Sequence, residues 1–119
     1  MKFNEMYEIV KYFEEKQLCV TYPHKTNKPL RADYKSHAEY GEAMDTWELS
    51  VVEWRENHKK YNDEIRKIND AFKSAVLDYL ELSNHPKADK FWELVWDRGH
   101  SGGYSDIVIE AETLAELLK

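Results

Sequence analysis

Residues 96–106, WDRGHSGGYSD, contain the residue types that could carry nucleophilic chemistry in this chain. Asp97, His100 and Ser101 match the acid, base and nucleophile of a catalytic triad. That chemistry needs the base to reach the nucleophile while a third group orients the base, and residues so close in one loop seldom achieve both contacts. The segment also lacks the strand–turn–helix context of a nucleophile elbow and the Gly-Lys-Ser/Thr of a phosphate loop. We therefore expect no catalytic residue here and treat His100 and Ser101 as candidate partner contacts; a small enzyme or ligand-binding protein that uses them is the alternative.

The same segment also has a structural interpretation, as the turn between two helices. Gly99 ends an apolar periodic stretch, where a helix-capping residue with positive φ is expected. Gly102 and Gly103 allow a sharp reversal of the chain, and Ser105 or Asp106 can begin the next helix. We expect Gly99, Gly102 and Gly103 to be structural turn residues.

Residues 23–35, PHKTNKPLRADYK, form the clearest irregular segment, because two prolines and a Thr-Asn pair oppose regular structure. The segment is basic, and its candidate partner-binding residues are Lys25, Lys28 and Arg31. These side chains suit an acidic partner or a phosphate. The alternative is a solvated connector between helices.

Composition limits the classes of function. The 119 residues carry a formal net charge of −6, which disfavours nucleic-acid binding through a basic surface. Charged residues make up 34% of the chain and the mean hydropathy is −0.79, so much of the chain must face water. No run approaches the roughly 18 apolar residues of a membrane span, so none is expected. A single cysteine, Cys19, cannot form an internal disulfide, and the start MKFNEMYEIV lacks the apolar segment of a signal peptide. We expect a cytoplasmic protein with no metal and no cofactor.

Periodicity predicts an all-α fold in a single helical domain over residues 1–119. Apolar residues recur at three and four over residues 3–18, 87–98 and 105–118, which indicates an N-terminal helix and a C-terminal helical pair. Between them, a coiled-coil-like helix is expected at about residues 38–83, with Ser36 or Asp33 as its cap. Its seam is Tyr40, Met44, Trp47, Val51, Trp54, His58, Tyr61, Ile65, Ile68, Phe72, Ala75, Tyr79 and Leu82.

Bulky aromatic residues make this seam unlike a simple leucine zipper. We expect four of them to be mostly buried against the N-terminal and C-terminal helices: Trp47, Trp54, Phe72 and Tyr79. The seam also allows a homodimer, and a break near residues 56–58 into a helical hairpin is the main alternative for the long helix. His58 suits a hydrogen-bonded structural residue, with a metal or catalytic role as the alternative.

The run HPKADKFWELVWDRGHSGGYSDI, residues 85–107, is similar to a pattern in small uncharacterised proteins of tailed bacteriophages and prophages. In that pattern an Asn/His-Pro-Lys-Ala opening leads to an aromatic helix, then Gly-His-Ser, a small residue, Gly and an acidic–apolar pair. The matching positions are Pro86, Lys87, Ala88, Trp96, Gly99, His100, Ser101, Gly103, Asp106 and Ile107. The resemblance covers about two thirds of the chain, and only its Gly-His-Ser portion is specific. The chain departs from it at residues 109–111, where the pattern has tyrosines, and the first 35 residues match nothing.

The resemblance implies a phage accessory protein and brings no established catalytic residues. We therefore expect a phage-encoded protein in the host cytoplasm that binds a host protein stoichiometrically and modulates or inhibits it, with defence proteins among the targets. A structural coiled-coil protein is a further alternative, although the positions beside the seam lack the alternating Glu and Lys of paired zippers.

Overall fold

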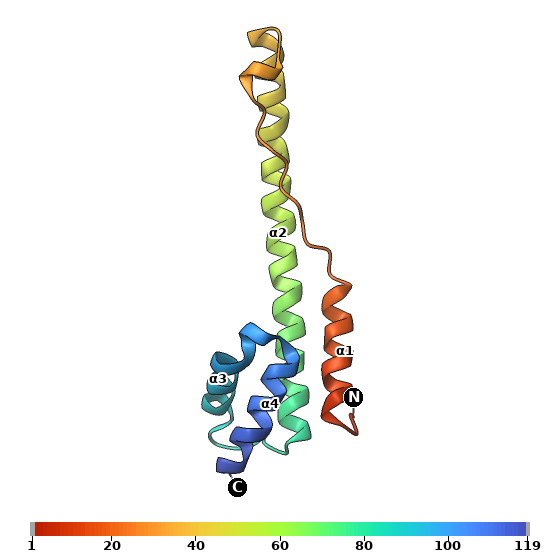
Figure 1. Ribbon diagram of the computed structural model, residues 1–119, viewed down its shortest axis with the longest axis vertical. Helices are drawn as coiled ribbons and strands as arrows, with labels where there is room; N and C mark the ends of the chain where they lie inside the picture. The colour runs from red at the N-terminus through yellow and green to blue at the C-terminus, as the bar shows by residue number, and fades with distance from the viewer. Residues whose placement is uncertain (1, 119) are drawn as a thin grey trace. The chain divides into compact units, whose positions relative to one another are not determined.

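The computed structural model describes residues 2–118 as an all-helical chain (Figure 1). Its α-helices are α1 (Met6–Leu18), α2 (His37–Tyr79), α3 (Ala88–Gly99) and α4 (Tyr104–Ala115), and no β-strand occurs within the described residues. The expected all-α class is therefore confirmed, with one long helix, an N-terminal helix and a C-terminal helical pair. Within the described part of the chain, no helix is both long enough and apolar enough to cross a membrane.

The long helix α2 begins where the sequence indicates. The Ser36 hydroxyl accepts a hydrogen bond from the Glu39 N–H at 3.1 Å, so Ser36 is the cap and Asp33 is not. The helix continues through residues 56–58, so the alternative of a helical hairpin with a break there is wrong. His58 lies in the helix interior, with Asn62 Nδ2 3.2 Å from its Nδ1.

The end of α2 comes at Tyr79, four residues before the expected end at residue 83. The Leu82 N–H donates to the Leu77 carbonyl at 2.8 Å, and the Glu81 N–H donates to the Asp78 carbonyl at 3.1 Å. This is the Schellman pattern, in which the residue after the cap adopts the left-handed conformation. Glu81 does so with φ 59°. Leu77 and Leu82 occupy the two positions at which apolar residues usually accompany the motif, and both are buried.

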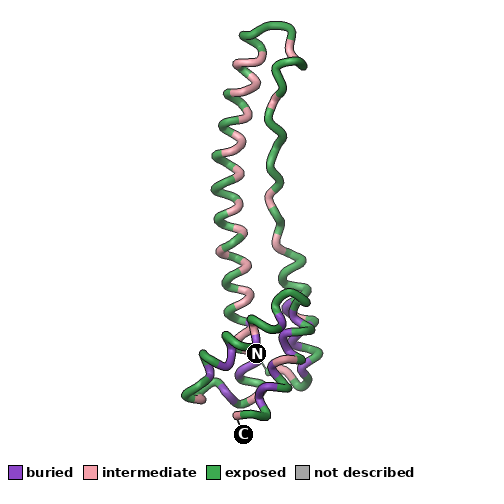
Figure 2. The backbone as a smooth tube through the Cα atoms, turned by 60° about the vertical axis from the view of Figure 1, so that its left-hand side comes forward, coloured by how far each residue is buried: buried purple, intermediate pink, exposed green. Residues whose placement is uncertain are grey.

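Two compact units divide the chain: Met1–Cys19 with Ile65–Lys119, called unit 1 below, and Val20–Glu64, called unit 2. Every buried residue among residues 2–118 belongs to unit 1, as the purple segments in Figure 2 show. No side chain of residues 20–64 is buried; each is either partly or largely exposed. Apolar burial is the main favourable term in folding, so its benefit is concentrated in unit 1.

Phe72 lies at the centre of the unit 1 core and is fully buried, as expected. Its ring contacts Phe13 of α1 at 5.5 Å, Trp92 of α3 at 5.8 Å and Tyr104 of α4 at 4.3 Å between centroids. One aromatic side chain of α2 therefore joins the other three helices of the unit. Tyr79, in contrast, is 39% exposed, so its expected burial is wrong.

Tyr104 is the first residue of α4, and its ring is buried while its hydroxyl stays bonded. The hydroxyl donates to Asn69 Oδ1 at 2.7 Å, so this polar atom is satisfied within the core. Burial raises the pKa of the Tyr104 phenol above its ordinary value, because the ionised form is poorly solvated there.

Candidate functional site

Residues 99–103 form the turn between α3 and α4, as expected, but the structural roles of Gly99 and Gly103 differ from those predicted. Gly99 has φ −111°, an ordinary value, so its expected positive φ is wrong. Positive φ occurs instead at Gly103, with φ 83° and ψ −171°. Helix α4 begins at Tyr104, so the cap position is Gly103, which has no side chain to form a capping bond. The expected caps, Ser105 and Asp106, lie inside the helix.

Gly99 is required for a different reason, the close approach of two helices. A Cβ atom there would lie 2.7 Å from the Ile107 Cα, 2.9 Å from the Ile107 nitrogen and 3.0 Å from the Asp106 carbonyl oxygen. All three are backbone atoms of α4, which cannot rotate away as a side chain can. Gly99 is itself buried. A side chain at this position would therefore force the end of α3 away from the start of α4.

His100 and Ser101 are exposed on a single 3₁₀ turn, His100–Gly102, of unit 1. His100 Nδ1 lies 2.7 Å from the Trp96 carbonyl oxygen. The imidazole stacks on the Trp96 ring, with an angle of 9° between the two ring planes. A carbonyl can only accept, so Nδ1 carries the hydrogen and Nε2 of the neutral ring is the acceptor. Among the described residues no hydrogen bond joins His100 to Ser101 or to Asp97. The three side chains are thus neighbours without the contacts of a triad.

Unit 2 consists of residues 20–36, called the arm below, and the first part of α2, and the arm runs antiparallel to that part of the helix (Figure 1). The Trp54 indole N–H donates to the Pro23 carbonyl at 3.3 Å, and the Trp47 indole N–H donates to the Thr26 carbonyl at 3.1 Å. Thr26 also shares a 2.8 Å hydrogen bond with the hydroxyl of Ser50. Trp47 and Trp54 therefore pack against the irregular arm and stay partly exposed. Their expected burial against the terminal helices is wrong.

The spacing of these contacts follows from backbone geometry. The two tryptophans are seven residues apart on a helix that rises 1.5 Å per residue, a separation of about 10.5 Å. Pro23 and Thr26 are three residues apart in extended backbone, which spans roughly 10 Å at about 3.3 Å per residue. One heptad of α2 therefore matches three residues of the arm. The two prolines disfavour a helix over residues 23–29, in agreement with the extended path of the arm, whereas the pairing of arm and helix comes from the structure.

The predicted basic contact residues, Lys25, Lys28 and Arg31, lie on the arm and are positioned by neighbouring groups of unit 2. The Lys25 ammonium lies 5.3 Å from the centroid of the Trp54 ring and the Lys28 ammonium 5.9 Å from that of Trp47, both within cation–π range. The Arg31 guanidinium donates to the Tyr34 carbonyl at 2.8 Å. All three basic side chains remain exposed, so they are positioned by the chain itself and still open to solvent.

Aromatic rings continue the arm's contacts toward the start of unit 2. The centroid of the Tyr22 ring lies 5.0 Å from that of Tyr61 and 5.9 Å from that of His58. The centroids of the His58 and Trp54 rings are 5.0 Å apart. His58 is half-buried in this cluster and bonded to Asn62. Within residues 2–118 no three His, Cys, Asp or Glu side chains are placed to hold a metal ion.

The predicted contact residues therefore fall on two surfaces. Lys25, Lys28 and Arg31 belong to unit 2, whereas His100 and Ser101 belong to unit 1. The sequence alone does not indicate which unit each segment joins, so the five residues were predicted as one set.

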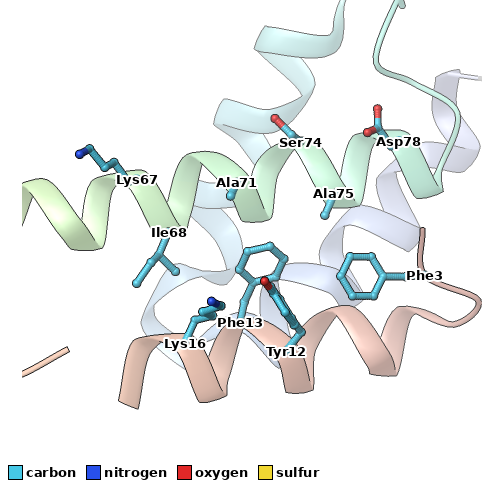
Figure 3. A pocket seen from close by; sticks show the side chains of 10 residues that line it. All are labelled: Phe3, Tyr12, Phe13, Lys16, Lys67, Ile68, Ala71, Ser74, Ala75 and Asp78. Atoms are coloured by element: carbon cyan, nitrogen blue, oxygen red, sulfur yellow. The ribbon is translucent and has the colours of Figure 1, made fainter. Parts of the chain in front are cut away.

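A groove between α1 and α2 in unit 1 was missed by the sequence reasoning (Figure 3). Its volume is about 610 Å³, and its apolar walls come from the aromatic residues of α1 and the small residues of α2. The lining residues are Phe3, Tyr12, Phe13, Lys16, Lys67, Ile68, Ala71, Ser74, Ala75 and Asp78. The helical periodicity assigned Phe3 and Phe13 to a core stripe, and only their packing reveals that they also border an open space.

Comparison with known proteins gives one match. Residues 11–119 match the model of a family described as a family of unknown function, DUF8546. No curated protein matches, and no solved structure matches. The match spans α2, α3, α4 and the arm, together with most of α1.

Proposed function

The chain belongs to DUF8546, a family of unknown function, and from that premise we propose that it is a binding protein that acts on a protein partner by stoichiometric contact. Unit 2 provides the contact surface. Its aromatic and basic residues are held in place by the arm–helix contacts and remain open to solvent. Such a surface can engage a partner without further ordering, which lowers the entropic cost of association.

The observation that carries the proposal is the exposure of apolar side chains throughout unit 2. Tyr22 is 50% exposed, Leu30 65%, Leu49 71% and Val52 52%. Leu49 and Val52 are three residues apart on α2, so they share one face of the helix. Contiguous exposed apolar side chains mark interaction sites, so the neighbouring pair Leu49 and Val52 is the main apolar part of the proposed contact surface.

Charge gives this surface an orientation. Residues 20–35 carry four basic residues and one acidic residue, whereas residues 37–64 carry eight acidic and three basic residues. The arm is therefore net basic and the helical part of the same unit is net acidic. A partner with the complementary arrangement would be steered into one register, chiefly through a faster association rate.

The resemblance of residues 85–107 to small phage proteins supports a host protein as the partner. In this proposal the protein is phage-encoded, works in the host cytoplasm and modulates or inhibits a host enzyme or defence protein. His100 and Ser101 provide a second, smaller contact on unit 1, where the His100 ring is already fixed by its stacking on Trp96.

Titration against a candidate host enzyme tests the proposal. Full inhibition should be reached near one protomer per target site, and full effect at a hundredfold lower dose would mean turnover and overturn it. The paired charge reversal Lys25→Glu, Lys28→Glu should slow association at low salt by roughly tenfold or more and have less effect at high salt. The matched control is Lys87→Glu with Lys90→Glu, which makes the same charge change in unit 1.

The apolar part of the surface needs a separate variant. Leu49→Glu with Val52→Glu should weaken binding while leaving the far-UV circular dichroism spectrum unchanged, because both side chains are more than half exposed. Sedimentation of the protein alone then distinguishes the competing occupant, a second copy of the chain. A dimer abolished by the same two substitutions would assign this face to self-association and would remove it from the proposed partner surface.

A further inference from the structure

We infer that the face of α2 beneath the arm is a binding site for an extended, basic, proline-flanked peptide segment. The arm fills this site within the chain, and a segment of the same chemistry from a partner protein competes for it. The inference goes beyond the proposed contact, which uses the side chains that the arm leaves open to solvent. It rests on the aromatic residues of α2, the period of the arm's contacts with them, and the opposite charges of arm and helix.

Four aromatic residues spaced seven apart on α2 form a series, called the aromatic ladder below: Tyr40, Trp47, Trp54 and Tyr61. All four are partly buried, and all belong to unit 2. Each of these rings carries an N–H or O–H that can donate a hydrogen bond. In unit 1 the same heptad position holds Ile68 and Ala75, whose side chains have no donor. The donors are therefore found on the part of α2 that belongs to the same unit as the arm.

The arm meets the ladder at every third residue. Among residues 20–30 only Val20, Pro23 and Pro29 are partly buried, and Thr26, which completes the series, accepts the Trp47 N–H through its carbonyl. A β-strand has a period of two, so its carbonyls three residues apart point to opposite sides. A polyproline-II helix has three residues per turn and rises about 9.3 Å per turn, close to the about 10.5 Å between neighbouring rings of the ladder. The contacts of the arm therefore have the period of polyproline II.

The ladder holds the arm chiefly through its main chain. The indole N–H groups of Trp54 and Trp47 donate to the carbonyls of Pro23 and Thr26, and any residue can supply a carbonyl. Aromatic-lined grooves bind polyproline-II segments because such segments are already extended before they bind. Side-chain chemistry enters where the ammonium groups of Lys25 and Lys28 lie over the Trp54 and Trp47 rings. The segment that fits is therefore of the type Pro-x-Lys-x-x-Lys-Pro, as in residues 23–29.

Charge selects a basic segment, and exposure makes the arm exchangeable. Residues 37–53 of α2 include five acidic residues and no Lys or Arg, which favours a basic occupant. No side chain of residues 20–64 is buried, and regions with few buried apolar contacts open at a small cost in free energy. The arm is joined to a helix at both ends, so it lifts as a loop and competes at a high local concentration. A partner segment should therefore bind weakly to the parent chain and more tightly when the arm is loosened.

A peptide with the sequence of residues 20–32 tests the exchange against the isotope-labelled full-length protein. Because the peptide is unlabelled, NMR follows the arm of the protein separately from the peptide. As peptide is added, the amide signals of Asn27 and Lys28 should move toward random-coil positions, while the indole N–H signals of Trp47 and Trp54 should stay at hydrogen-bonded positions. The indole signals of Trp92 and Trp96, in unit 1, are the internal control and should not move.

Substitutions in protein and peptide separate backbone from charge. The protein variant Pro23→Gly with Pro29→Gly loosens the arm and should bind the parent peptide roughly tenfold more tightly, because the fraction of molecules with an open site rises. Two altered peptides should bind this variant roughly tenfold more weakly than the parent peptide, at about two- to fivefold per residue. One carries Pro23→Gly with Pro29→Gly, and the other carries Lys25→Glu with Lys28→Glu. Unchanged Trp92 and Trp96 signals will show that unit 1 of the variant is folded.

Several results would overturn the inference. Asn27 and Lys28 signals that stay in place in the loosened variant would mean that the peptide does not replace the arm. Equal affinity of the three peptides would remove the selection for proline and for positive charge. Sedimentation tests the competing occupant, since a dimer of the loosened variant would assign the ladder to the arm of a second copy. No host protein takes part in these measurements, so this inference and the proposed function fail separately.

Discussion

Replacing Gly99 with alanine tests how closely α3 and α4 approach. The new Cβ would lie 2.7 Å from the Ile107 Cα, whereas ordinary contact begins at 3.4 Å, so the two helices must separate by about 0.7 Å. A gap of roughly that size forfeits about a quarter to a half of the dispersion attraction across an interface. Forced expansion of a packed core costs about 1–3 kcal/mol.

One opposing effect reduces this cost. Alanine is favoured over glycine in a helix interior by about 1 kcal/mol. Position 99 should gain only part of that, because it is the last residue of α3, and its φ of −111° adds no backbone strain for alanine. The expected net loss in the free energy of unfolding is therefore about 1–2 kcal/mol. This corresponds to a fall of roughly 4–8 °C in the melting temperature for a chain of this size.

Urea unfolding followed by circular dichroism measures the change, with Gly102→Ala as the matched control in the same turn. The atoms nearest to a Cβ at Gly102 all belong to the exposed side chain of Asp106; its carboxyl group can rotate into solvent, and the Asp106 Cβ, at 2.9 Å, requires a small local shift. We expect a smaller loss of stability there than at Gly99, because one contact with an exposed side chain is relieved more easily than three contacts with helix backbone. If Gly99→Ala were as stable as the parent, or if Gly102→Ala cost as much, the close backbone approach would not be the constraint at Gly99.

Three further substitutions test separate features. Glu81→Gly should raise the free energy of unfolding by about 1 kcal/mol, because glycine has no penalty at φ 59°; Glu81→Ala should give no such gain in the same urea titration. Tyr104→Phe should cost about 1 kcal/mol at pH 7 through the lost bond to Asn69. Since the folded phenol has the raised pKa, the parent should also lose stability as the pH rises above about 10, where the unfolded phenol ionises first, and this part of the alkaline loss should be absent in the variant. Trp54→Phe deletes the indole N–H that bonds the Pro23 carbonyl and should speed tryptic cleavage of the arm several-fold; unchanged cleavage would mean that this bond does not hold the arm.

The helices were predictable because their signals are local. Apolar periodicity placed α1, α3 and α4 to within three residues at each end, and the Ser36 cap was visible as a residue type before a periodic stretch. The end of α2 was not predictable in this way. A glutamate takes the left-handed position that glycine usually fills, so composition gave no warning that the helix stops there.

The candidate surfaces show what periodicity cannot provide. A heptad seam indicates that one face of a helix is covered, and it does not say by what. Trp47 and Trp54 therefore seemed to require helical neighbours, although an extended arm covers them. The prolines of residues 23–29 indicated a non-helical segment, but no local signal paired that segment with α2.

Gly99 illustrates the same limit at a single residue. Its place at a helix end suggested a conformational role, whereas its constraint comes from Ile107, which lies eight residues later on a different helix. The groove between α1 and α2 likewise depends on the pairing of two segments more than fifty residues apart in sequence. Neither feature leaves a local pattern.

The confinement of buried side chains to unit 1 has a consequence for the motions of α2. Its residues 65–79 belong to the unit that holds the core, while residues 37–64 have no buried side chain. An isolated helix gains little in water without tertiary packing, and amides protected only by such a helix open with small free energies. Amide hydrogen exchange should therefore be slow near Phe72 and quicken toward Ser36, so that one continuous helix reports two kinetic regimes.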